Sequence, residues 1–177
     1  MSDEIFTLSY LNEDDKAYGL AGMAISLAAL DAMDRVAEVS LDNAGPMVTF
    51  SNQYYFSGSP SISPKATWDN LLHNYYVTSA MVISNVMARS LVRLRRDVPS
   101  DVMKKIHEEI AEEGRDMCSL EDDEIETIYD KTRSYMGRIF RNTLLHPANE
   151  DFSRTLSRRR SLSGNEIIDE LRALSLI

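Results

Sequence analysis

Hydrophobic positions recur at the period of an α-helix over two long stretches of the chain. The first stretch, residues 13–41, is apolar almost all round and follows Asn12, a residue type that favours helix N-caps. The second stretch, residues 64–96, begins with Pro64 directly after Ser63, which is typical of a helix start. We therefore expect two long helices at the centre of the fold.

The rest of the chain predicts shorter elements. Apolar faces at helical spacing predict four further helices, at about 101–118, 122–145, 149–161 and 165–176. The pair His146-Pro147 marks the end of the second of these, and Ser163 with Glu166 forms a capping box before the last. Two β-prone runs, 47–50 and 53–56, predict one small hairpin at about 47–56, although Ser51-Asn52 between them is not a preferred turn pair.

These elements predict an all-α, multihelical bundle with two long helices, short C-terminal helices and one small β-hairpin. A length of 177 residues fits one domain, so we expect residues 1–177 to form a single helical domain, with 148–177 as a candidate C-terminal appendage. A composition of 44% hydrophobic and 27% charged residues is that of a folded globular chain. One cysteine excludes an internal disulfide and any multi-cysteine metal site.

The net charge of −9 argues against nucleic-acid or membrane binding over the whole surface. The uncharged run at residues 17–30 is too short to span a bilayer and follows acidic rather than basic residues. We therefore expect a cytoplasmic protein without a membrane segment. His107 lies among glutamates but lacks the Glu-x-x-His spacing of a di-iron bundle, and no nucleophile or phosphate-loop motif occurs. The sequence thus predicts no catalytic residue, no metal site and no cofactor.

Basic side chains gather late in the chain. Residues 131–160 carry a formal charge of +6, whereas residues 101–130 carry −9. The favoured interpretation is that the two segments neutralise each other, within the chain or with a partner. The alternative is an anion-binding patch that contacts nucleic acid. Its candidate residues are Arg154, Arg158, Arg159 and Arg160, to which Arg133, Arg138 and Arg141 could add.

Aromatic residues between positions 54 and 76 form the best pocket candidate. Asp69 and His73 are four residues apart on a predicted helix, so a hydrogen bond between them could orient the imidazole for acid–base work. Packing of a loop against a helix would explain the same cluster without any ligand. The candidate ligand-binding residues are Tyr54, Tyr55, Trp68, Asp69, His73 and Tyr76.

Taken together, these patterns favour a non-catalytic helical protein that acts through self-association or through a protein partner. A helix over 64–96 would be about 50 Å long, against a diameter of about 40 Å for a compact globule of this size. We therefore expect a homo-oligomer through helices 13–41 and 64–96, and no nucleic-acid binding. The alternatives are a small-molecule-binding or enzymatic protein using residues 54–76, and nucleic-acid contact through residues 154–160.

Overall fold

The computed structural model describes residues 6–42, 48–50 and 64–174, and this part of the chain is mostly helical. It confirms the expected multihelical fold. Six α-helices occur in it: α1 (Glu13–Ala29), α3 (Pro64–Met87), α4 (Ser100–Cys118), α5 (Asp122–Phe140), α6 (His146–Arg159) and α7 (Gly164–Ala173). None of the described helices is both long enough and apolar enough to cross a membrane.

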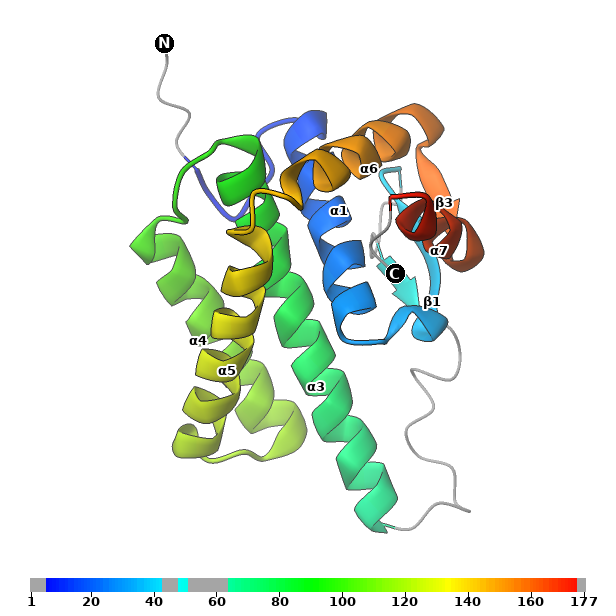
Figure 1. Cartoon of the computed structure of the whole chain (residues 1–177). Coiled ribbons are helices and arrows are strands. Elements are labelled where there is room, and N and C mark those ends of the chain that lie inside the picture. Colours follow the sequence, from blue (N-terminus) through cyan, green and yellow to red (C-terminus); the bar gives the residue numbers. More distant parts are fainter. Residues whose placement is uncertain (1–5, 43–47, 51–63, 175–177) are drawn as a thin grey trace.

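Helices α1 and α3 lie side by side at the centre of the molecule (Figure 1). The α4–α5 hairpin packs on one side of α3, and α6 crosses over α1. Residues of α1 are therefore covered on two sides by their own chain, and Leu20, Ala24 and Leu27 are fully buried. The apolar surface that suggested self-association is thus covered within one chain, and the oligomeric state remains a prediction.

Two glycines of α1 allow the close approach of α3. A β-carbon added to Gly22 would lie 2.5 Å from the Ala88 Cβ and 2.6 Å from the Ser84 carbonyl oxygen. A β-carbon added to Gly19 would lie 2.6 Å from the Asn85 Nδ2, which is the end of a flexible side chain. The small-residue face of α1 therefore packs directly against α3.

Substitution of Gly22 by alanine should destabilise the protein by about 1–3 kcal/mol, because the new methyl group meets backbone across the contact. Gly19→Ala should cost less, since the Asn85 amide can move aside. Urea unfolding of both variants measures the difference. Equal stability of Gly22→Ala and the wild type would contradict the close packing.

The first predicted helix is wrong beyond Ala29. After α1 the chain forms a 3-10 turn, η1 (Met33–Arg35), and then the strand β1 (Val36–Ser40). Asp31 takes a left-handed conformation with φ of 54°, which ends the helix. Residues 36–40 form a strand because they pair with residues 48–50 and 161–163. The hydrophobic periodicity of a short stretch of sequence does not show such pairing between separate segments.

The small sheet has three antiparallel strands in the order β2-β1-β3. Strand β2 (Val48–Phe50) falls inside the predicted hairpin at 47–56 and pairs with β1, whereas residues 53–56 lie outside the described part of the chain. Strand β3 (Ser161–Ser163) pairs with the other edge of β1 and joins α6 to α7. The sheet thus ties the C-terminal helices to the segment that follows α1.

Both C-terminal helices pack against this same chain. His146-Pro147 begins α6 instead of ending α5, because proline is tolerated in the first helical turn, where its missing N–H has no helical partner. The predicted capping box of Ser163 and Glu166 starts α7, with both reciprocal hydrogen bonds present. Leu171 of α7 is fully buried, and the helix contacts β1 and η1.

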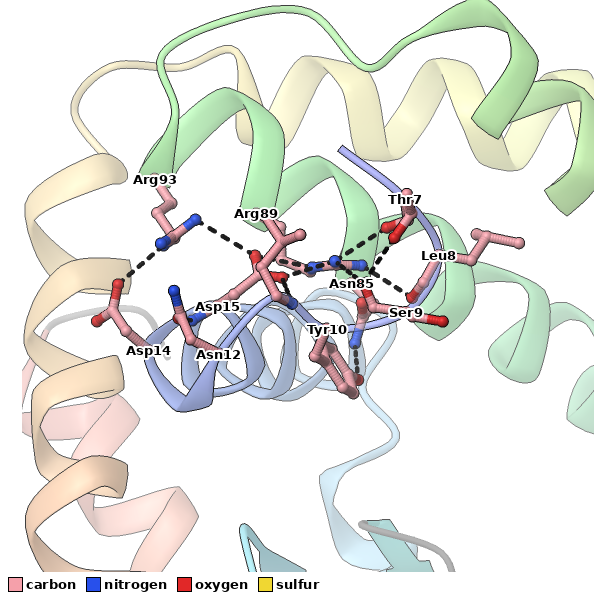
Figure 2. Close-up of polar contacts among 11 residues, drawn as sticks. Thr7, Leu8, Ser9, Tyr10, Asn12, Asp14, Asp15, Asn85, Arg89 and Arg93 are labelled. Atoms are coloured by element: carbon pink, nitrogen blue, oxygen red, sulfur yellow. Dashed lines mark hydrogen bonds and ion pairs between the residues drawn. The ribbon is translucent and has the colours of Figure 1, made fainter. Parts of the chain in front are cut away.

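A buried ion pair holds the N-terminal residues onto this core (Figure 2). The Arg89 guanidinium donates to both carboxylate oxygens of Asp15, at 3.0 and 2.7 Å, and neither side chain is exposed. It also donates to the carbonyl oxygens of the three residues 7–9, at 2.9–3.2 Å. The rings of Phe6 and Tyr10 lie 4.7 and 4.8 Å from the guanidinium carbon. One side chain therefore connects residues 6–10, α1 and the end of α3.

Substitution of Arg89 by methionine should cost about 3–5 kcal/mol of unfolding free energy, because it leaves the Asp15 carboxylate buried without its partner. The matched control is Arg115→Ala, whose ion pair with Asp122 is exposed and should be worth about 0–1 kcal/mol. Urea unfolding of both variants tests the prediction. A loss for Arg89→Met no larger than that of the control would contradict it.

Candidate functional site

Three adjoining hollows form one groove along the α4–α5 hairpin. Their volumes are about 500, 180 and 380 Å³. The first two share Leu91, Asp97 and Arg141, and the last two share Val98, Met103 and Arg133. We call this surface the basic groove; it is lined by Met87, Leu91, Arg95, Arg96, Asp97, Val98, Ser100, Met103, Lys104, His107, Tyr129, Arg133, Phe140, Arg141, Thr143 and His146.

Positive charge dominates the lining. Five lysine and arginine side chains and one carboxylate, Asp97, line the groove, a formal balance of +4 on a chain whose net charge is −9. Three further carboxylates pair with lining residues, which reduces the formal excess from +4 to +1: Glu150 with Arg95 at 2.5 Å, Glu126 with His107 at 2.5 Å, and Glu108 with Lys104 at 3.9 Å. Such a local reversal of sign attracts anions to one place on an otherwise acidic protein.

The groove also has an apolar component. Met103, Phe140 and Tyr129 are buried beneath it, while Leu91 and Val98 are half-buried along it. An anion site for a small inorganic ion needs only polar groups, whereas this surface offers apolar contact as well. The lining therefore suits a ligand with both negative charge and apolar groups.

One stripe of α5 supplies much of the groove wall. Tyr129 and Arg133 are four residues apart and so share one face of α5, and Arg141 follows directly after the helix ends at Phe140. Gly137 occupies the intervening position, where a β-carbon would lie 3.0 Å from the Arg141 Nη1 and 3.9 Å from the Met87 Cε. The two arginines are thus separated by a position without a side chain.

The opposite wall comes from the start of α4. Ser100, Met103, Lys104 and His107 follow helical spacing on one face of that helix. At this end the buried Tyr129 hydroxyl donates to the Met103 carbonyl oxygen at 3.3 Å. Burial raises the pKa of the Tyr129 phenol and outweighs the lowering effect of Arg133 nearby. Tyr129 therefore stays a neutral hydrogen-bond donor.

Unusual backbone geometry positions the arginine end of the groove. Helix α3 passes into η2 (Ala88–Arg93), a single π-helical turn, and the chain then turns through Arg95 with φ of 55°. This left-handed conformation costs an L-residue roughly 1–2 kcal/mol and is normally left to glycine at a helix end. π-Turns and strained residues gather at functional sites. The arginine at this strained position, Arg95, lines the first hollow and is therefore a candidate functional residue.

The buried His146 orients Arg95. The His146 Nε2 lies 2.8 Å from the Phe140 carbonyl oxygen, which can only accept, so Nε2 carries the proton. The Nδ1 of this neutral imidazole accepts a hydrogen bond from the Arg95 Nη1. Arg141 pairs with the exposed Asp97 at 3.2 Å across the same hollow. Exposed pairs of this kind exchange at little cost, so a ligand carboxylate could replace the protein's own.

The arginines at 154–160 have carboxylate partners elsewhere. Arg154 pairs with Asp151, Arg159 with Glu166, and Arg160 with both Glu13 and Asp42. None of these acids belongs to residues 101–130, so the expected pairing of those two segments is wrong for these three arginines. Neutralisation comes instead from acids that the fold brings next to α6. Arg158 is exposed on the same helix.

The aromatic candidates lie on different sides of α3. His73 is half-buried near Arg35 and Asp34 of η1, and its pKa is lowered by burial and then by Arg35. Tyr76 faces α5, with the Lys131 Nζ 6.0 Å from its ring centre. Trp68 and Asp69 are exposed, whereas Tyr54 and Tyr55 lie outside the described residues. The described members therefore do not converge on one point.

Sequence reasoning identified only part of the groove. Arg133 and Arg141 were grouped with other arginines as a basic patch, whereas Arg138 lies over the ring of Tyr135, with 5.6 Å between its guanidinium carbon and the ring centre. Arg95 and Arg96 were assigned to the end of a helix. The four-residue spacing of Tyr129 and Arg133 on one predicted helix was the available signal. Within the described residues, no group of three or more histidine, cysteine or acidic side chains is placed to hold a metal ion.

Comparison of the chain with models of protein families, with curated proteins and with solved structures finds no match.

The left-handed conformation of Arg95 is open to a direct test. Arg95→Gly and Arg95→Ala both remove the ion pair with Glu150, but only alanine retains the strain at φ of 55°. The glycine variant should therefore be more stable than the alanine variant by about 1 kcal/mol in urea unfolding. Equal stability would show that the backbone at this position is not strained.

Proposed function

We propose that this protein is a non-catalytic binding protein that recognises the acidic surface or segment of a partner protein through the basic groove. The observation that carries this proposal is the concentration of positive charge and apolar side chains in one groove of an acidic chain. Complementary charge speeds association and selects partners, while the apolar surface contributes affinity.

Two features favour a binding surface over the alternatives. The groove is built on α4, α5 and the end of α3, which are packed elements that keep its side chains in place. The candidate residues at 54–76 face different neighbours, which lends less support to a small-molecule or enzymatic site there. The four arginines at 154–160 lie beside four carboxylates, which leaves no excess of positive charge there and lends less support to nucleic-acid contact through them: Asp151, Glu166, Glu13 and Asp42.

Retention on a resin that carries short heparin fragments tests, at low salt, whether the groove is the anion-binding surface. The wild type should be retained despite its net charge, because the groove presents its positive face to the polyanion. Reversal of two groove charges, in Arg133→Glu with Arg141→Glu, should abolish retention.

The matched control carries Arg154→Glu with Arg158→Glu, which changes the net charge equally on α6. It should be retained as the wild type is, and circular dichroism should show that both variants are folded. Loss of retention in the control alone would move the anion-binding surface to residues 154–160. Absence of retention for the wild type would contradict the proposal.

A further inference from the structure

We infer that the occupant of the basic groove is a short acidic peptide segment of a partner protein that carries apolar side chains between its acids. This inference rests on the proposed function and adds the chemistry and size of the ligand. The basic side chains of the groove require acidic residues in the ligand, because opposite charges attract. The apolar floor of the groove requires apolar side chains between those acids.

The length of the groove limits the ligand. The axial distance from Tyr129 to Arg141 along α5 is about 18 Å at the rise of an α-helix. An extended peptide covers this distance with about 5–6 residues. The groove therefore fits one short segment, with Arg133 and Arg141 exposed at intervals along it.

The surroundings of the groove disfavour a long polyanion. Beyond His107 and Tyr129 the two helices carry Glu108, Glu112 and Glu126, and the segment 101–130 has a formal charge of −9. A nucleic acid carries a negative charge at every phosphate and would meet this repulsion outside the groove. A short peptide places its few acids beside the arginines and ends before the acidic region.

Gly137 provides room in the middle of the groove. Glycine inside a helix costs about 1 kcal/mol relative to alanine, so its presence in α5 needs a reason. A β-carbon there would face the Arg141 guanidinium and the end of Met87, which both line the middle hollow. The missing side chain therefore lets the Arg141 guanidinium pack against α5 between Arg133 and Arg141, in the middle of the groove.

The test uses fluorescence anisotropy with labelled probes of equal length. The first probe is an eight-residue peptide in which glutamate alternates with leucine, and the second replaces the leucines by serines at the same charge. An oligothymidylate of eight nucleotides is the third. The glutamate–leucine peptide should bind the wild-type protein at least about tenfold more tightly than the other two probes, because it alone combines acids with apolar groups.

Three variants show where the peptide binds. Arg133→Glu with Arg141→Glu should weaken binding of the glutamate–leucine peptide by about tenfold or more, and Arg154→Glu with Arg158→Glu should leave it unchanged. Gly137→Leu should weaken binding of the peptide by about tenfold, because the larger side chain displaces the Arg141 guanidinium from the middle of the groove. Gly137→Ala provides a milder displacement if the leucine variant does not fold.

The outcomes separate this inference from the proposed function. Equal binding of the serine-containing peptide, or tighter binding of the oligothymidylate, overturns the peptide inference while groove-dependent heparin retention still supports an anion-binding surface. If the wild-type protein is not retained on heparin, both the proposed function and the peptide inference are wrong. If the Gly137→Leu variant binds the glutamate–leucine peptide as tightly as the wild type does, the peptide does not bind beside Gly137 of α5.

Discussion

The buried pair of Arg89 and Asp15 is the interaction on which most of this structure depends. It removes two charges from water, which is costly unless the geometry satisfies both groups. Here each guanidinium nitrogen donates to an oxygen, and the two aromatic rings of Phe6 and Tyr10 enclose what remains. The arrangement fixes the N-terminal residues, the start of α1 and the end of α3 relative to one another.

The same interaction also helps to position the groove. Arg89 lies in the π-turn of η2, where the chain changes from the buried end of α3 to the exposed turn that carries Arg95 and Arg96. With the inner side of this turn held by Asp15, its outer side presents Leu91 and Arg95 to the first hollow. A buried charge pair on one side thus orients an exposed cationic surface on the other.

Distribution of charge over the fold gives this protein its polarity. Arg159 at the end of α6 and Arg160 directly after it are paired with acids, Glu166 of α7, Glu13 of α1 and Asp42 shortly after β1, so that face is locally balanced. The groove on α4 and α5 keeps an excess of positive charge beside a strongly acidic end of the same two helices. This sharp change of sign over a short distance favours a short, acidic ligand and opposes a long one.

The sequence by itself determined most of the helices, because their periodicity and capping residues act locally: Asn12 starts α1, and Ser163 with Glu166 starts α7. Only the tertiary structure decided that residues 36–40 form a strand, since its partners come from 48–50 and 161–163. The groove, too, depends on tertiary packing. Arg95 and Arg141 are far apart in the sequence, and only the packing of the helices brings them to the same hollow.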